Sequence, residues 1–267
     1  MEKKFKLGVI GAGFMASAIV KGALSSGALN KEQVIMSDIS EEFLTKAKNL
    51  GVNTTTDNLF LANSSEYVLF AVKPQSLNNV LESIKTTDCG RFISIMAGIK
   101  KQRILDCFPN SKIARCMPNT PCSIASGAVG IDASLFNDNE KAFIKSLFEP
   151  ISSVFFVEEE KLNAVTGVSG SAPAYFYLFV KSIIDAGIKN GLKEEDAKTL
   201  AVSTMIGAGK MIVENPDKSL DELICAVCSK GGTTIEAVNV FINGGLEKLV
   251  DDAIKACINR SFELENC

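Results

Sequence analysis

Apolar residues in the first 160 positions form short runs, separated by stretches with a helical period. Phe5–Ile10 is a compact apolar run, and the spacing after it predicts a helix from about 14 to 26. Further runs predict strands at 34–37, 67–72, 92–96, 113–116 and 154–157. Strands that alternate with helices over this distance are typical of a parallel, doubly wound sheet. Residues 1–160 are therefore predicted to form an α/β domain.

The pattern changes near residue 160, and from Lys161 onward it is helical with few strand-like runs. Pro173 stands in the first turn of a predicted helix, where proline is tolerated, and Asn215-Pro216 closes a second helix over 194–213. Two more helices are expected after Gly231-Gly232 and over 246–263. The first two helices carry more apolar residues than one small bundle covers. Residues 161–267 are predicted to form an all-α domain that dimerises.

The composition excludes several kinds of chemistry. None of the 267 residues is histidine, so there is no Ser-His or Cys-His nucleophile pair, no imidazole proton shuttle and no histidine-ligated zinc. The formal net charge of −3 argues against nucleic acid as a partner, because its binders present a basic face. Catalysis would have to use hydroxyls, carboxylates, lysines, thiols or a cofactor.

The eight cysteines form no tight framework and indicate reduced thiols. Cys225-x-x-Cys228 lacks the second pair or the histidines that a structural zinc needs, so no metal site is predicted. Lysines precede the first apolar stretch as in a secretory signal, but Gly11 and Gly13 interrupt that stretch. No apolar run approaches the ~18 residues of a membrane span. We expect a cytoplasmic protein with no membrane partner.

A glycine-rich fingerprint, G-x-G-x-x-A, stands between the first strand and the first helix. Gly11 would make the tight turn, Gly13 would let the backbone approach a pyrophosphate at the helix N-terminus, and Ala16 would let the helix pack on the sheet. A helix start that needs glycine only for packing is the alternative. The fingerprint predicts a Rossmann-type dinucleotide site, with candidate cofactor-binding residues Ile10, Gly11, Ala12, Gly13, Phe14 and Met15.

Asp38 follows the second predicted strand. A carboxylate there would accept hydrogen bonds from the adenine-ribose hydroxyls of NAD and repel the 2′-phosphate of NADP, which favours NADH. In the alternative interpretation, Asp38 is a turn residue that caps the helix starting near Glu41. The two roles are compatible.

A second constellation is Ser229-Lys230-Gly231-Gly232-Thr233-Thr234, followed by apolar residues at helical spacing. A glycine-rich turn that opens a helix presents unpaired N–H groups and a positive dipole end, which suits a carboxylate. The alternative is an ordinary helix start, with Thr233 as the N-cap for the N–H of Glu236.

Two further loops each come just after a predicted strand: Lys73-Pro74 and Met117-Pro118-Asn119-Thr120-Pro121. Ligands bind outside the carboxyl ends of strands in such sheets, so both loops are expected to line the crevice. A rigid connection without ligand contact would also explain the prolines.

These motifs together resemble the pyrroline-5-carboxylate reductases, and the resemblance covers nearly the whole chain. Besides the fingerprint, it rests on the blocks Ala71-Val72-Lys73-Pro74, 117–121, 164–175, 185–187, 207–211 and 229–235.

The resemblance implies reduction of 1-pyrroline-5-carboxylate to L-proline by NADH or NADPH, on a Rossmann domain and a helical domain that interlocks into a homodimer, often assembled into a decamer. It implies that the turn with Gly232 and Thr233 binds the substrate carboxylate, and that Thr234 hydrogen-bonds or protonates the ring nitrogen. Ser229 and Ser169 would lie near the substrate and nicotinamide. Asn58, and Ala71, Val72, Lys73 and Pro74, would contact the cofactor.

Three residues depart from the family pattern. Lys230 stands where the family usually has proline, Ala172 where glycine is common, and Asp38 where many members carry a neutral residue suited to NADPH. Two rival functions remain: a dehydrogenase of the same architecture for another imine or hydroxy acid, and a non-catalytic NAD-sensing protein. The second rival has no reason to retain Gly232-Thr233-Thr234.

Overall fold

The computed structural model describes residues 3–265, and its contacts divide them into two compact units. The first unit comprises 3–171 and 257–265, and the second 172–256. The first contains an eight-stranded sheet in the order β3-β2-β1-β4-β5-β6-β7-β8. Its strands are β1 (Phe5–Ile10), β2 (Val34–Ser37), β3 (Asn53–Thr55), β4 (Ser65–Phe70), β5 (Arg91–Ser94), β6 (Lys112–Pro118), β7 (Gly127–Asp132) and β8 (Ser152–Phe156).

The sheet is parallel from β3 to β6, whereas β7 runs antiparallel to β6 and β8 runs parallel to β7. Strand β1 lies between β2 and β4, with Ile10 opposite Ser37 on one side and Phe70 on the other. Strands β2 and β3 lie on one side of β1, and β4 and the later strands lie on the other, so the strand order reverses beside β1. The loops that follow β1, β2 and β4 meet at this switch point, where doubly wound sheets bind ligands.

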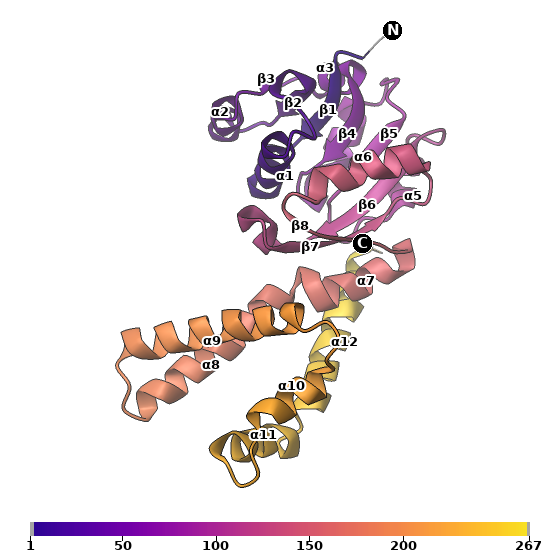
Figure 1. Ribbon diagram of the computed structural model, residues 1–267. Helices are drawn as coiled ribbons and strands as arrows, with labels where there is room; N and C mark the ends of the chain where they lie inside the picture. Colours follow the sequence, from indigo (N-terminus) through magenta and orange to yellow (C-terminus); the bar gives the residue numbers. More distant parts are fainter. Residues whose placement is uncertain (1–2, 266–267) are drawn as a thin grey trace. The chain divides into compact units, whose positions relative to one another are not determined.

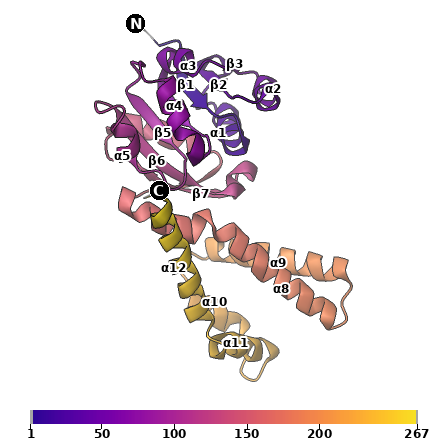
Figure 2. The ribbon, with the colours of Figure 1, turned by 180° about the vertical axis from the view of Figure 1, so that it is seen from behind.

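Helices cover both faces of the sheet (Figures 1 and 2). One apolar cluster packs the face that carries Leu7 and Val9, and the other packs the face that carries Phe5 and Ile10. The first face is covered by α1 (Phe14–Ser25), α2 (Glu41–Asn49) and α6 (Asp138–Phe148), and the second by α3 (Asn58–Ser64), α4 (Leu77–Ser83) and α5 (Lys101–Leu105).

Each predicted strand is present, but some of its ends differ by up to two residues, and two further strands were not predicted. The strand predicted at 67–72 is β4, which begins and ends two residues earlier, so Ala71 and Val72 belong to the following loop. Strands β3 and β7 were not predicted. The first is a polar edge strand of sequence Asn-Thr-Thr, and the second contains two glycines, so neither has the apolar run that signals a strand.

The second unit is helical. It contains α8 (Ala172–Lys189), α9 (Glu194–Glu214), α10 (Leu220–Val227), α11 (Thr233–Asn243) and the first part of α12 (Leu246–Glu265). Helices α8 and α9 lie side by side as an antiparallel pair (Figures 1 and 2). Helix α10 was not predicted, although its capping box of Ser219 and Glu222 is visible in the sequence. Among the described residues, no helix is long and apolar enough to cross a membrane.

The last turns of α12 belong to the first unit, where buried polar contacts hold them. The Ser261 hydroxyl donates to Asn163 Oδ1 at 2.6 Å, and Glu265 forms an ion pair with the buried Arg115 at 2.7 Å. Asn163 also donates to Glu265 Oε2 at 3.1 Å. Burial alone would raise the pKa of Glu265, but the bond from Asn163 and the charge of Arg115 hold this pKa below its ordinary value.

Candidate active site

The turn after β1 brings two backbone segments into close contact. Gly11 has a φ of +98°, and a Cβ placed on it would lie 2.7 Å from the carbonyl oxygen of Ala71. The Ala71 N–H donates to Ile10 O at 2.8 Å, and the Gly11 N–H donates to Ser37 O at 2.8 Å. Both the conformation and the lack of space require glycine at position 11.

Gly13 has a different role. It is the N-cap of α1 with a φ of −69°, and a Cβ placed on it would meet nothing within 4 Å. The first N–H groups of α1 point out of the helix without intrahelical acceptors. Ala16 behind them is 1% exposed and packs into the core beneath the helix. The space in front of Gly13 and the dipole of α1 suit a phosphate group.

The Asp38 carboxylate is held by two backbone N–H groups. Its Oδ2 accepts from Ala12 N at 2.7 Å, and its Oδ1 accepts from Ser40 N at 2.8 Å. The alternative interpretation is half right: Asp38 is a turn residue that bonds to the N–H of Ser40, but the N-cap of α2 is Ser40 itself. Asp38 also connects the end of β2 to the fingerprint loop, which fixes its carboxylate beside the N-terminus of α1.

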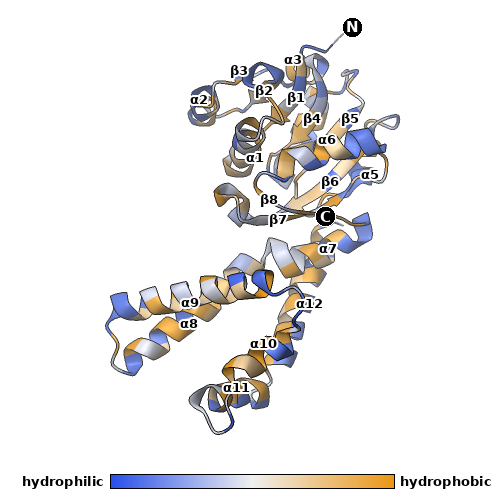
Figure 3. Cartoon of the chain, in the orientation of Figure 1, coloured by the Kyte–Doolittle hydropathy of each residue, from blue (hydrophilic) through white to orange (hydrophobic). Residues whose placement is uncertain are grey.

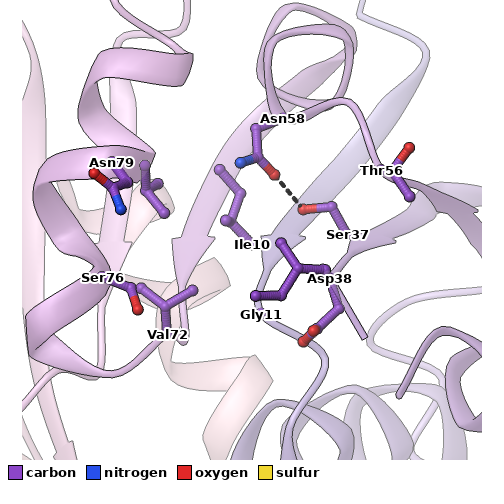
Figure 4. Close-up of a pocket in the computed structure, with 11 residues that line it drawn as sticks. Ile10, Gly11, Ser37, Asp38, Thr56, Asn58, Val72, Ser76 and Asn79 are labelled. Atoms are coloured by element: carbon purple, nitrogen blue, oxygen red, sulfur yellow. Dashed lines mark hydrogen bonds between the residues drawn. The ribbon is translucent and has the colours of Figure 1, made fainter. Parts of the chain in front are cut away.

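A cavity of about 190 Å³ opens beside this turn (Figure 4). Ser37 donates to Asn58 Oδ1 at 2.7 Å, and Asn58 in turn donates to Ser83 Oγ at 3.1 Å. The amide of Asn58 is thereby oriented by two hydroxyls from different elements. The cavity is lined by Ile10, Gly11, Ser37, Asp38, Ile39, Thr56, Asn58, Val72, Ser76, Asn79 and Val80.

Five of the predicted cofactor residues line this cavity: Ile10, Gly11, Asp38, Asn58 and Val72. The others lie in the two adjoining loops and at the start of α1: Ala12 is buried, Met15 half-buried and Phe14 exposed, while Ala71, Lys73 and Pro74 follow β4. Sequence reasoning missed Ser37, Ile39, Thr56, Ser76, Asn79 and Val80. Ser37, Ile39 and Thr56 stand at or just after the carboxyl end of β2 or β3, which is the signal that could have found them. Ser76, Asn79 and Val80 lie in the 3₁₀ turn Pro74–Ser76 and on α4, which no strand end marks.

The second constellation lies in the helical unit and forms a turn that needs both of its glycines. Gly231 has a φ of +72°. A Cβ on Gly232 would lie 2.3 Å from the Ser229 hydroxyl, and the Gly232 N–H donates to Ser229 O at 3.0 Å. Gly232 is the N-cap of α11 and Thr233 its first residue, so the alternative with Thr233 as N-cap is wrong. Because glycine has no capping side chain, the first N–H groups of α11 are available to an anion.

Ser169 lies in the first unit, on a π-helical turn (Thr166–Gly170) between the short helix α7 (Leu162–Val165) and α8. The side-chain amide of Asn119, which follows β6, donates to the Ser169 hydroxyl at 3.2 Å. Turns of this kind occur frequently at functional sites. The predicted substrate residues therefore fall in two places: Ser169 in the first unit, and Ser229, Gly232, Thr233 and Thr234 in the second.

A glycine-rich turn, a free helix N-terminus and an acidic residue after the second strand meet at one switch point. These are the parts of a dinucleotide site, and they define the class of the protein as an NAD(P)-dependent oxidoreductase.

Comparisons with known proteins identify the family. The pyrroline-5-carboxylate reductase dimerisation model matches residues 159–264, and the model for NADP oxidoreductase, coenzyme F420-dependent, matches residues 6–98. The pyrroline-5-carboxylate reductase of Haemophilus influenzae is 38% identical over 261 residues, which is 96% of each chain. That of Vibrio alginolyticus is 35% identical and covers 99% of each chain. The chain belongs to the pyrroline-5-carboxylate reductase family.

Solved structures agree with this assignment. The pyrroline-5-carboxylate reductase of Coxiella burnetii superposes with a TM-score of 0.91 at 32% identity, over 98% of this chain and 99% of the other. The Plasmodium falciparum reductase with NADP bound superposes with a TM-score of 0.86 at 29% identity, over 99% and 100%. The resemblance inferred from sequence motifs, the fold class and the enzyme class are thereby confirmed.

Substitution of the two fingerprint glycines by alanine should have opposite effects: Gly13→Ala should weaken cofactor binding and spare stability, and Gly11→Ala should lower stability. Gly13→Ala should change the free energy of unfolding by less than about 1 kcal/mol, because its Cβ enters open space. It should raise the Kd of NADH and NADPH at least ~tenfold, because the added methyl group stands where the pyrophosphate approaches. Gly11→Ala should destabilise the fold by about 1–3 kcal/mol. Urea unfolding and fluorescence titration measure the two effects, and an unchanged Kd for Gly13→Ala would contradict the phosphate assignment.

Proposed function

We propose that this protein reduces 1-pyrroline-5-carboxylate to L-proline with NADH or NADPH, as the last step of proline biosynthesis in the cytoplasm. The observation that carries the proposal is similarity to reductases of this name along the whole chain, together with a dinucleotide cavity at the switch point. The test is oxidation of NADH and NADPH, followed in parallel with 1-pyrroline-5-carboxylate and with an acyclic 2-keto acid as a control. Oxidation with the keto acid alone would favour the hydroxy-acid rival.

That rival has little support from the helical unit. Hydroxy-acid enzymes of this architecture usually place a catalytic lysine in the first long helix of the second domain. Lys181 is the candidate on α8, but its side chain is 70% exposed and pairs with Asp185, one turn later, at 2.5 Å. This is an ordinary surface ion pair on a solvated helix face.

We propose that the two units divide the work. Near residue 160, where the match to the dimerisation model begins, the chain passes from a dinucleotide-binding domain to a substrate and dimerisation domain. The fingerprint, Asp38 and Asn58 would hold the cofactor, together with Ala71, Val72, Lys73 and Pro74. The nicotinamide supplies the hydride for the imine carbon. The protein contributes binding, orientation and the placement of one proton.

For the substrate, we propose that the N-terminus of α11 binds the carboxylate. The N–H groups of Thr233 and Thr234 begin the helix, and the positive dipole end faces the same way. The Thr234 hydroxyl would hydrogen-bond the ring nitrogen, with Ser229 and Ser169 near the ring. A substrate that arrives as the iminium needs no acid. For a neutral imine, Thr234 would relay a proton from water, a weak acid made effective by proximity.

Thr234→Ala should lower kcat by about ten- to a hundredfold, because it removes the group that positions the ring nitrogen and its proton. The Kd of NADPH should change less than ~twofold, since the dinucleotide site lies in the first unit. Thr234→Ser, which retains the hydroxyl, should recover most of the loss. Steady-state kinetics and NADPH titration separate the two effects. Wild-type turnover in Thr234→Ala would remove this hydroxyl from the mechanism.

For the cofactor, we propose a preference for NADH, based on the fixed charge of Asp38. A 2′-phosphate beside this carboxylate would meet a like charge that two backbone bonds hold in place. Like charges in such contact cost several kcal/mol. The relative of Plasmodium falciparum has NADP bound, so the proposed preference would set this chain apart from that relative.

Asp38→Asn removes the charge but retains the bond to the fingerprint loop, because the amide oxygen can still accept the Ala12 N–H; only the bond from the Ser40 N–H is lost. We expect the ratio of kcat/KM for NADPH to kcat/KM for NADH to rise at least ~tenfold in Asp38→Asn and in Asp38→Ser. Asp38→Ser, whose shorter side chain also loses the bond from the Ala12 N–H, should in addition loosen the fingerprint loop and weaken the binding of both cofactors. Asp88→Asn, on the exposed surface, is the matched control. A ratio that stays at its wild-type value in both Asp38 variants would contradict the proposed NADH preference.

We propose that the helical unit forms a homodimer, and that dimers assemble further into a decamer. The match to a dimerisation model indicates an oligomer. Helices α8 and α9 carry many apolar residues (Figure 3). The side chains of many of these residues are exposed within one chain. Tyr177 is 64% exposed, Leu178 68% and Met211 55%. Soluble monomers rarely expose patches of this extent, so a second copy is the natural cover.

Sedimentation velocity should show the wild type as a dimer or larger species. Leu178→Glu on α8 should shift it towards the monomer, because a charge on a buried apolar interface is costly. Lys46→Glu, at an exposed position on α2 of the first unit, should leave the assembly unchanged. A monomeric wild type would contradict the proposal.

A further inference from the structure

The loop between β6 and β7 is organised by one side chain, that of Asn119, which directly follows β6. Its Oδ1 accepts from Ala128 N at 3.0 Å and from the Cys122 thiol at 3.8 Å. Its Nδ2 donates to the hydroxyl and the carbonyl oxygen of Ser169, at 3.2 and 3.4 Å. Its backbone carbonyl accepts from Cys122 N at 3.1 Å.

The chemistry of these partners fixes which way the amide points. The Ala128 N–H can only donate, so it requires the amide oxygen, and the Ser169 carbonyl can only accept, so it requires the amide nitrogen. No other standard side chain of this length presents one acceptor and one donor in a rigid plane. Aspartate at this position would place a negative oxygen against the Ser169 carbonyl.

The part of the loop that follows Asn119, residues 120–127, is tightly packed. Cys122 is fully buried, and a Cβ on Gly127 would lie 2.3 Å from its sulfur. Ala125 has a φ of 55°, which is the only left-handed backbone among the described non-glycine residues. The 3₁₀ turn Thr120–Ile124 also contacts α1, the helix that begins at the fingerprint. Asn119 is therefore attached to a fixed support next to the dinucleotide site.

The segment that Asn119 holds is the π-helical turn Thr166–Gly170. The Ser171 N–H closes this turn by donating to Thr166 O at 2.9 Å. Gly170 leaves room for Met117, whose Cε lies 2.8 Å from the position of a Gly170 Cβ. The turn thus packs on the carboxyl end of β6. That end lies on the same edge of the parallel sheet as the loops after β1 and β4.

We infer that Asn119 is a positioning residue for the reduction, and that it acts through Ser169 by fixing the π-helical turn against the sheet edge. This inference rests on the proposed function, because it takes Ser169 to lie beside the reacting ring. Asn119 does not touch the substrate in this account. It sets the position of a hydroxyl that does, and a shift of about 1 Å in such a group can cost a hundredfold in rate.

The test uses the full chain with Asn119→Asp, and with Asn53→Asp as the matched control. Asn53 also donates its amide to a backbone carbonyl, that of Val34, at 3.3 Å, but on the edge strand β3. We expect Asn119→Asp to lower kcat about ten- to a hundredfold, with the Kd of NADPH within ~twofold of wild type. Asn53→Asp should leave kcat unchanged. An equal loss in both variants, or none in Asn119→Asp, would overturn the inference.

A double-mutant cycle tests whether the effect passes through Ser169. If it does, Ser169→Ala should make the further loss from Asn119→Asp much smaller than that loss in the wild type. Losses that multiply independently would show that Asn119 acts by another route.

Hydrogen exchange of the protein without cofactor gives a readout that does not depend on activity. In Asn119→Asp, the amides of 166–171 should exchange about tenfold faster, and those of β1 at the wild-type rate. Unchanged exchange at 166–171 would overturn the inference even if the wild type reduced no 1-pyrroline-5-carboxylate. Absence of 1-pyrroline-5-carboxylate reduction by the wild type would refute the proposed function. In that case the exchange rates alone would decide whether Asn119 holds the turn.

Discussion

The dinucleotide site depends on the close approach of two backbone segments, Gly11 and Ala71, at the switch point of the sheet. The Ala71 N–H bonds to Ile10 on one side of the turn, and its carbonyl lies where a Gly11 side chain would be. This contact sets where β1 ends and therefore where α1 begins. The space in front of Gly13 and the direction of the α1 dipole follow from it, because both are fixed once the helix start is fixed.

Much of this arrangement could be predicted from the sequence, since its strongest signals are local. The apolar run of β1, the fingerprint and the glycines before α11 each need only neighbouring residues to be recognised. Strand β3 could not be found in this way, because three polar residues form a strand only when β2 is already beside them. The same holds for the hydrogen bonds from Asn119 to Ser169 and from Asn163 to Glu265. These join residues 50 and 102 positions apart, and no spacing rule connects them.

Asp38 shows how one side chain can serve folding and recognition together. Its carboxylate takes the N–H of Ala12, so it supports the loop on which the cofactor rests. In the proposed cofactor site, its charge would face the place where the two nicotinamide cofactors differ. A chain that changed its preference by replacing this residue would also have to find a new acceptor for that N–H, since an unpaired, partly buried N–H costs free energy. If Asp38 selects the cofactor as proposed, cofactor selectivity and loop stability are coupled at this position.

The return of α12 to the first unit has a consequence for the order of events during synthesis. Arg115 is buried on β6, and its closest carboxylate partner is Glu265, which lies 150 positions later, beyond the whole helical unit. A ribosome that has made the whole sheet has still to add about a hundred residues before this partner emerges. The N-terminal unit therefore cannot finish folding ahead of the helical one, as sequential domains usually do. Until the helical unit has been made, Arg115 has only the carboxylate of Glu159, at 3.4 Å, as its partner, and the closer ion pair with Glu265 forms afterwards.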